Sequence, residues 1–188
     1  EGIRSSMSIH KLNKSEVNNI LDVARLLGKK CTAVIITSDK CYDNLELERG
    51  YHENDFLGGK DPYSASKGAA ELVVKGYCHS FFKTQDLIRV ATARAGNVIG
   101  GGDWAKDRII PDCIRAWEKD EKVKIRNPHS TRPWQHVLEP LSGYLHLGQQ
   151  LDENIELNGQ SFNFGPHERN DHTVLELLEI MAKHYYAN

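Results

Sequence analysis

The sequence predicts an α/β domain built around a parallel sheet. Short apolar runs, typical of buried strands, alternate along the chain with longer segments of helical periodicity, as in strands joined by crossover helices. The 188 residues, 39% of them hydrophobic, are enough for one domain with its own core. The predicted strands are residues 33–37, 87–93 and 161–164, and the predicted helices are 17–27, 63–82, 108–117, 140–151 and 173–185.

The first third of the chain carries clear local signals. Residues 1–15 are polar and aperiodic, so we expect a ragged or disordered start. The helix over 17–27 is followed by Gly28, a common helix stop. Residues 33–37 form a β-branched run, typical of a strand buried on both faces. Charged and glycine-containing residues over 43–62 predict a long loop.

The remaining elements follow from similar signals. Asp61 and Pro62 precede the helix over 63–82, and proline is favoured in the first turn of a helix. The glycine run 100–102 breaks the pattern after the second strand. Residues 123–125 predict one more short strand in the second half.

Composition narrows the classes of function. The net charge is −2 and the pI about 6.5, so no basic excess is available for nucleic acid. No run of about 18 apolar residues predicts a membrane span. The four cysteines lack C-x-x-C spacing, and the nine histidines form no metal-ligand pattern. We therefore expect four reduced thiols in a cytoplasmic protein, with no metal site.

A phenol and an ammonium share one face of the helix over 63–82. Tyr63 and Lys67 are four residues apart, and such pairs are neighbours on a helix surface. A phenol ionises near pH 10, roughly, so one that acts as a base near neutrality needs a nearby positive charge. This spacing alone is as often accidental as functional. However, Ser38 directly follows the strand over 33–37, at the sheet edge where α/β proteins bind ligands.

The Ser38, Tyr63 and Lys67 set resembles the catalytic arrangement of short-chain dehydrogenases. Longer motifs are similar to matching stretches of the CDP-glucose 4,6-dehydratases, from about residue 17 to about residue 185, whereas residues 1–15 do not resemble that family. These motifs are residues 94–104, 126–129, 132–144 and 163–166, whereas residues 36–43 resemble the sugar-nucleotide dehydratases in general. The resemblance implies a Rossmann-type doubly wound parallel sheet whose first strands are missing, part of a smaller substrate-binding domain, and NAD as the cofactor.

The resemblance also implies how the chain is divided. Residues 16–104 would be the carboxyl-terminal part of the NAD-binding domain, and 105–188 a partial substrate-binding region with a returning strand and helix. The sequence has no G-x-G-x-x-G or G-x-x-G-x-x-G turn after a first strand. We therefore expect an internal fragment that is inactive by itself. The resemblance also implies that the complete enzyme forms homodimers through the Tyr63 helix and its neighbour.

Five residues receive catalytic roles from the resemblance. Tyr63 would take the proton of the sugar C4 hydroxyl as hydride leaves for NAD, and Ser38 would hydrogen-bond the same oxygen. Lys67 would keep Tyr63 ionised and contact the nicotinamide ribose, so Ser38, Tyr63 and Lys67 are also expected to bind the cofactor. Asp39 would protonate the departing C6 hydroxyl. Lys40 would remove the C5 proton, and its alternative is an exposed loop lysine.

Six residues receive substrate-binding roles in the same way. They are Arg94, Asn97, Arg108, Arg132, Trp134 and His136. The arginines would bind the pyrophosphate, because a guanidinium meets phosphate oxygens as a fork, and Asn97 would donate to the same group. Trp134 and His136 would flank the nucleotide. The alternatives are ordinary salt-bridge arginines and a buried aromatic.

The substrate implied is CDP-glucose and the product CDP-4-keto-6-deoxyglucose. One alternative is a dehydratase acting on a UDP-N-acetylhexosamine, against which the runs 41–43 and 132–136 argue. A 4-epimerase has no use for Asp39 and Lys40 together. The alternative from another class is a non-catalytic remnant that binds sugar nucleotides, and copurified NAD would separate it from a holoenzyme.

Overall fold

A computed structural model describes residues 14–105, 107–166 and 172–187. The chain forms two compact units: Glu1–Ala95 with Leu141–Phe164, and Gly96–Pro140 with Gly165–Asn188. The boundary expected after residue 104 therefore falls inside the second unit, and the returning strand and helix belong to the first. Of the expected ragged start, residues 1–13 lie outside the described residues, whereas residues 14 and 15 begin a helix.

The first unit is built on a three-stranded parallel sheet, which confirms the predicted fold class. Its strands are β1 (Cys31–Ile36), β2 (Ile88–Ala95) and β6 (Ser161–Phe164), in the order β1-β2-β6. In this register Ile36 lies opposite Ala93, and Arg94 lies opposite Asn163. The central strand β2 is thus paired on both sides, and its carboxyl end reaches the edge where ligands of such sheets bind.

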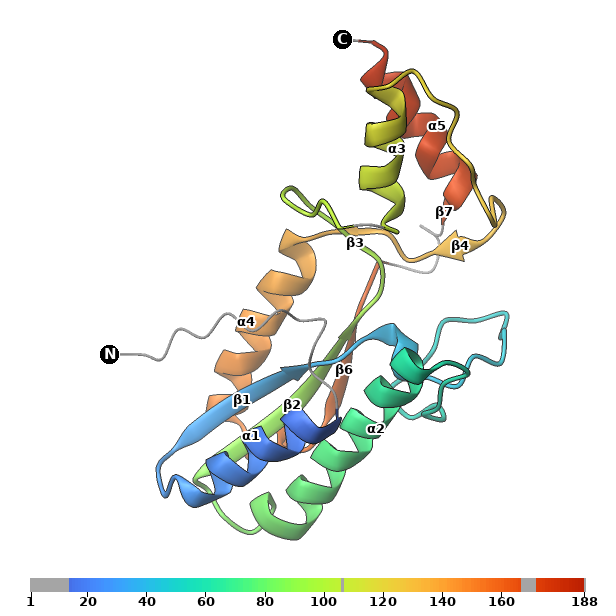
Figure 1. Cartoon of the computed structure of the whole chain (residues 1–188). Coiled ribbons are helices and arrows are strands. Elements are labelled where there is room, and N and C mark those ends of the chain that lie inside the picture. The colour runs from blue at the N-terminus through green and yellow to red at the C-terminus, as the bar shows by residue number, and fades with distance from the viewer. Residues whose placement is uncertain (1–13, 106, 167–171, 188) are drawn as a thin grey trace. The chain divides into compact units, whose positions relative to one another are not determined.

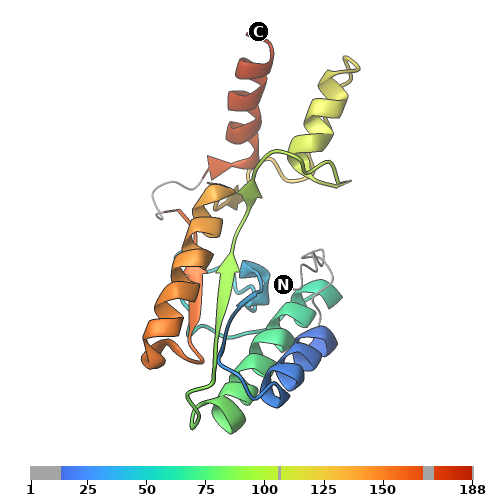
Figure 2. The ribbon, with the colours of Figure 1, turned by 90° about the vertical axis from the view of Figure 1, so that its left-hand side faces the viewer.

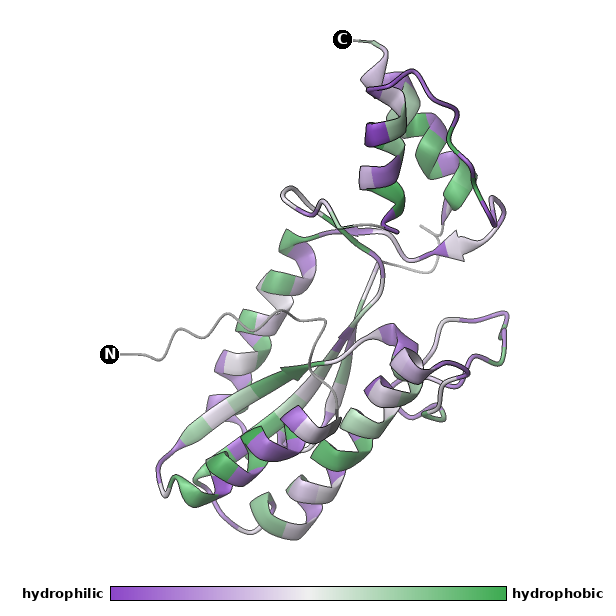
Figure 3. Ribbon diagram, in the orientation of Figure 1, coloured by the Kyte–Doolittle hydropathy of each residue, from purple (hydrophilic) through white to green (hydrophobic). Residues whose placement is uncertain are grey.

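Helices cover both faces of this sheet. The helices α1 (Lys14–Leu26) and α2 (Pro62–Tyr77), the latter extended by the π-helical turn η3 (Cys78–Phe82), lie on one face, and α4 (Leu138–Glu153) lies on the other (Figures 1 and 2). The central strand β2 is therefore buried along most of its length, whereas β1 and β6 are mostly half-buried. Most of β1 is hydrophobic, whereas α1 and α2 show mixed hydropathy (Figure 3).

Each face of the sheet has its own hydrophobic core, and the side chains of β2 alternate between these two cores. Ile88 and Val90 pack with α1 and α2, whereas Ala91 and Ala93 pack with α4. Thr92 and Arg94 continue the row that begins with Ile88 and Val90, because successive side chains point to opposite faces. Two polar side chains therefore lie buried on the α2 face, near the carboxyl end of the strand.

The second unit packs α3 (Ile109–Trp117) with α5 (Val174–Tyr185) around Cys113, Val174 and Leu178. Its strands are short pairs: β3 (Val98–Ile99) with β5 (Gln135–His136), parallel, and β4 (Thr131–Arg132) with β7 (His172–Thr173), antiparallel. The prediction of a strand at 123–125 was wrong. Its residues Val123 and Ile125 pack on the helical core by their side chains, while their backbone joins no strand of the described residues.

Candidate active site

The amino terminus of α2 places Tyr63. Asp61 is the N-cap, and its carboxylate accepts hydrogen bonds from the backbone amides of Tyr63 (2.9 Å) and Ser64 (3.1 Å). The Ser64 hydroxyl donates to the same carboxylate, and these hydrogen bonds lower the pKa of Asp61. Pro62 occupies the first helical turn, where its missing N–H is harmless. Tyr63 is thus fixed at the second position of the helix.

Tyr63 and Lys67 form the expected pair. The Lys67 Nζ lies 5.6 Å from the centre of the Tyr63 ring. Tyr63 is 41% exposed, so its phenol can reach a ligand, whereas Lys67 is 2% exposed. Burial lowers the pKa of Lys67, and the charge of Glu16 opposes that effect. A buried amine beneath an accessible phenol is an arrangement suited to proton transfer at the phenol oxygen.

Ser38, Asp39 and Lys40 form a second group directly after β1. Ser38 caps the 3₁₀ turn η2 (Asp39–Cys41) by accepting a hydrogen bond from the Lys40 amide at 3.3 Å. The Ser38 hydroxyl donates to Asp39 Oδ1 at 2.9 Å, and the Lys40 Nζ lies 3.3 Å from the same oxygen. Ser38 is buried and Lys40 exposed. A hydroxyl, a carboxylate and an amine therefore meet within one turn.

Two glycines allow the loops of this site to approach α2. A Cβ on Gly68 would lie 3.2 Å from the carbonyl oxygen of Cys41, and one on Gly59 would lie 2.3 Å from the amide nitrogen of Ala65. Gly68 directly follows Lys67, so η2 packs on the helix beside the buried amine. The structure thus brings together the turn that carries Ser38 and the helix that carries Tyr63.

Arg94 does not have the role expected from the sequence. It is 2% exposed and forms a buried ion pair with Glu71, Nε to Oε1 at 2.9 Å and Nη2 to Oε2 at 2.8 Å. Its Nη1 donates to the Tyr42 hydroxyl and to the carbonyl oxygen of Glu53. Burial lowers the pKa of Arg94, but the hydrogen bonds and charge of Glu71 raise it more. With its donors engaged inside the fold, Arg94 is a structural residue rather than a ligand of pyrophosphate.

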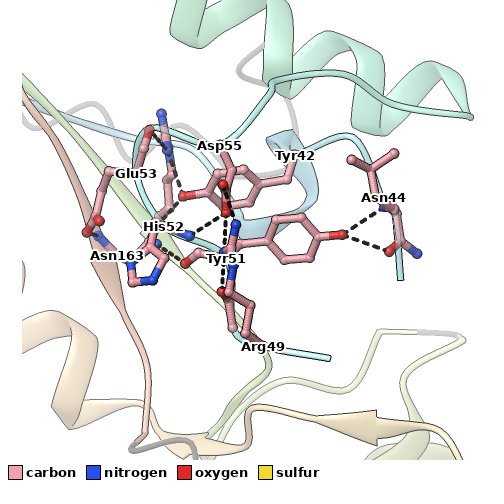
Figure 4. Close-up of polar contacts among 11 residues, drawn as sticks. Tyr42, Asn44, Arg49, Tyr51, His52, Glu53, Asp55 and Asn163 are labelled. Carbon is pink, nitrogen blue, oxygen red and sulfur yellow. Dashed lines mark hydrogen bonds and ion pairs between the residues drawn. The ribbon is translucent and has the colours of Figure 1, made fainter. Parts of the chain in front are cut away.

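The predicted loop over 43–62 is ordered by polar contacts around Tyr42 (Figure 4). The Tyr42 and Tyr51 rings stack with centroids 5.0 Å apart. The Tyr42 hydroxyl donates to the Asn163 side chain at 2.7 Å, and Asn163 Nδ2 donates to the carbonyl oxygen of Tyr51 at 2.8 Å. Arg49 closes the loop through a forked pair with Asp55. The loop is therefore anchored on β6.

The other expected substrate residues lie in the second unit. Asn97 precedes β3, and its buried Oδ1 has no hydrogen-bond partner among the described residues. Arg132 is exposed on β4, where its Nη1 donates to the Thr131 carbonyl. Trp134 is half-buried and packs against the core of the second unit, with Nε1 donating to the His172 carbonyl. The exposed His136 accepts the Leu138 amide at Nδ1.

Arg108 precedes α3 and lies 3.8 Å from Asp103, a long and exposed ion pair. Sequence reasoning missed Thr37 and Glu71, whose side chains are hydrogen-bonded and so connect the Ser38 segment with the helix of Tyr63. Glu71 follows Lys67 by four residues and is a lone charge in the run Ala-Ala-Glu-Leu-Val-Val. A carboxylate in so apolar a stretch was a signal that it is buried with a partner.

Three further observations concern the described residues as a whole. No cluster of three or more histidine, cysteine or acidic side chains there could hold a metal ion. Their helices include none long and apolar enough to cross a membrane. All four cysteines are free thiols, and burial raises the pKa of Cys41 to about 12.

The parallel sheet with helices on both faces places the chain in the class of Rossmann-type α/β proteins. The NAD dependent epimerase/dehydratase family matches residues 5–165, and the chain belongs to that family. Because the match begins at residue 5, the expectation that residues 1–15 fall outside the family was wrong for most of that segment.

Curated and solved relatives agree with this assignment. The chain is 50% identical over 168 residues to the CDP-glucose 4,6-dehydratase of Salmonella typhimurium, covering 87% of the chain but only 47% of that protein. It is similar in fold to a dTDP-glucose 4,6-dehydratase from Streptomyces venezuelae (TM-score 0.76, 20% identity, 91% of this chain and 49% of that one). A UDP-glucuronic acid 4-epimerase from Bacillus cereus gives a TM-score of 0.77 at 17% identity, covering 97% and 56%.

Proposed function

We propose that this chain belongs to a sugar-nucleotide 4,6-dehydratase that converts CDP-glucose to CDP-4-keto-6-deoxyglucose with bound NAD. The observation that carries the proposal is the Ser38-Asp39-Lys40 turn packed against the helix of Tyr63 and Lys67. Removing water requires an acid and a base in addition to the residues that oxidise C4, and this turn offers both. The 50% identity to a CDP-glucose 4,6-dehydratase supports the choice of substrate.

The donor set of the first unit fits the nicotinamide end of a dinucleotide. The partly exposed Tyr63 phenol and the Lys67 amine lie on one helix, and Ser38 stands at the end of β1. When bound, NAD accepts a hydride from C4 of the sugar and returns it to C6. Tyr63 and Lys67 would hold the nicotinamide ribose through hydrogen bonds, which orients the ring against the sugar.

Oxidation at C4 needs a proton acceptor. Tyr63 takes the proton of the C4 hydroxyl at its phenol oxygen, and Ser38 hydrogen-bonds the same substrate oxygen. The Lys67 ammonium favours the ionised phenol, because an opposite charge nearby stabilises an anion. Tyr63 and Ser38 thus act on one substrate oxygen, Lys67 acts through Tyr63, and the product of the step is a 4-ketone.

Elimination of water follows, because the ketone acidifies the C5 hydrogen. Lys40, as a free amine, takes the C5 proton, while a protonated Asp39 gives its proton to the C6 oxygen, which leaves as water. Lys40 then returns its proton to C5 as C6 is reduced. The proton gained by Tyr63 equals the one lost by Asp39, so exchange with solvent restores the starting state. Lys40 is exposed, as in its alternative as a loop lysine, but its Nζ lies 3.3 Å from Asp39, so a proton passed from the ammonium to the carboxylate would give both groups the form that the elimination needs.

The nucleotide would be held by residues of the second unit. Arg132 is an exposed guanidinium, and Asn97 would donate through its Nδ2 amide, because pyrophosphate oxygens only accept hydrogen bonds. We assign the pyrophosphate to Arg132 and Asn97, with Arg108 as a further cation and His136 near the nucleotide. Trp134 supports this surface from the core. Arg94 is left out because its donors are used within the fold.

Isotope labelling tests the proposal on the full-length protein. CDP-glucose carrying deuterium at C4 should give a product with one water less and with deuterium in the C6 methyl group. Unlabelled substrate in D₂O should gain one deuterium at C5. An epimerase would keep the label at C4 and lose no water, whereas a binding module would give no product, and either result would overturn the proposal. Faster turnover of a UDP- or dTDP-sugar would overturn the choice of nucleotide.

We also propose that the protein forms a homodimer through α1 and α2. Large apolar side chains are exposed on these helices, at Ile20, Val23, Leu26 and Leu72, and directly after α1, at Leu27. Such a patch on adjacent helices is a typical interface. In light scattering, Val23→Asp should halve the mass of the particle, whereas Leu145→Asp, on the exposed face of α4, should leave it unchanged. Equal masses for wild type and Val23→Asp would refute this interface.

A further inference from the structure

The Glu71 carboxylate accepts hydrogen bonds from two strands of the sheet and from the residue that directly follows the third. On β2, Arg94 donates to both carboxylate oxygens and Thr92 donates to Oε2 at 2.7 Å. On β6, the Ser161 hydroxyl lies 3.2 Å from Oε2. At the end of β1, the Thr37 hydroxyl donates to Oε1. Glu71 is 3% exposed, so these bonds are shielded from water.

The hydrogen bonds from Thr37 and Thr92 to Glu71 connect different parts of the fold. Thr37 directly precedes Ser38, and Glu71 follows Lys67 by one helical turn. The hydrogen bond between Thr37 and Glu71 therefore links the segment that carries the serine to the helix that carries the phenol and the amine. Thr92 makes a similar bond to Glu71, but it lies in the middle of the sheet, opposite Ile35.

We propose that the hydrogen bond from Thr37 to Glu71 sets the position of Ser38 relative to Tyr63 and Lys67, and that Thr37 and Glu71 are positioning residues for the reaction. The inference rests on the proposed function. Ser38 and Tyr63 must meet the same substrate oxygen, yet they stand on separate elements. Arg94 holds the Glu71 carboxylate against β2 through two hydrogen bonds. The acceptor of the Thr37 hydroxyl is therefore fixed in position.

The two threonines provide a matched test in the full-length protein. Thr37→Val and Thr92→Val each remove one buried hydroxyl that donates to the same carboxylate, and both keep the shape of the side chain. We expect Thr37→Val to lower kcat by about 10- to 100-fold, the effect of a small misplacement of reacting groups, with KM nearly unchanged. Thr92→Val should keep kcat within about twofold of wild type. Thr37→Ser retains the hydroxyl and should restore most of the rate.

The outcomes separate this inference from the proposed function. Equal losses of kcat in the two valine variants, or a Thr37→Ser variant as slow as Thr37→Val, would overturn the positioning role. If the wild-type protein makes no dehydrated product, the proposed function fails, and amide hydrogen exchange decides the inference alone. Faster exchange over 61–68 in Thr37→Val than in Thr92→Val then supports it, and equal exchange overturns it.

Discussion

Breaking the buried pair of Glu71 and Arg94 should strongly destabilise the first unit. Both side chains are 2% exposed, so removing one partner leaves a charge that water cannot reach. Such a loss typically lowers the free energy of unfolding by about 3–5 kcal/mol. For Arg94→Met we expect a loss at the lower end of this range, because the hydroxyls of Thr37, Thr92 and Ser161 still surround the carboxylate. The loss for Glu71→Gln should be larger, since this variant leaves a buried guanidinium without its carboxylate.

Urea unfolding followed by circular dichroism measures these losses. The double variant Glu71→Gln/Arg94→Met keeps neither charge of this pair, so its loss of unfolding free energy should be smaller than the sum of the single losses by about 2 kcal/mol. The exposed pair of Lys30 and Asp152 is the control, and Lys30→Met should move the midpoint little. Additive losses, or an Arg94→Met variant no less stable than the control, would refute this account of the pair.

Acid should remove the stability that the Glu71–Arg94 pair contributes. Burial raises the pKa of Glu71, but hydrogen bonds and charge from Arg94 outweigh it, so the net shift is downward. A carboxylate whose folded-state pKa is below its unfolded value, roughly 4.3 for glutamate, adds stability above that value. This stability is lost as the pH falls through the folded-state pKa. The stability gap between wild type and Glu71→Gln should therefore narrow on acidification below about pH 4, and a constant gap would contradict the assigned shift.

Four further predictions concern chemistry. Tyr63→Phe should slow oxidation at C4 by roughly 10²-fold or more while CDP-glucose still binds, and near wild-type turnover would remove the central assignment. Arg132→Ala should raise KM by about 10- to 150-fold, the worth of a hydrogen bond to a charged group, whereas the exposed Lys119→Ala should not. A thiol reagent at neutral pH should modify Cys31 first by mass spectrometry, because the other thiols are buried. Residues 1–188 alone should give no product from NAD and CDP-glucose, and chromatography would reveal any that forms.

The sequence predicted the elements whose side chains follow one clear period. The strand at 161–164 has the predicted bounds, and the helix predicted at 173–185 begins one residue later. The helix over 63–82 changes to a π-helical turn at Cys78, which apolar spacing does not reveal. The strand expected at 123–125 failed because β-branched residues can pack by their side chains without a partner strand. Strands of two residues, such as β3 and β4, are too short to show a period.

The candidate catalytic residues could be proposed from the sequence because their positions depend on local geometry. Spacing of four residues fixes Tyr63 and Lys67 on one helix face, and the end of a strand fixes Ser38. The structure adds how these segments meet, through the packing of Gly68 against the Cys41 carbonyl. That contact joins residues far apart in the chain, which no periodicity encodes.

Arg94 shows why the remaining site residues are harder to predict. In the sequence, an arginine at the end of a predicted strand has the same appearance whether it faces a ligand or another residue. The outcome depends on Glu71, which lies on a helix 23 residues earlier and points at the same face of the sheet. Because the Glu71 carboxylate is buried between α2 and the sheet, a buried cation must accompany it. Arg94 is the side chain that β2 places there. The ion pair then serves the site indirectly, because it holds the acceptor to which Thr37, next to Ser38, donates.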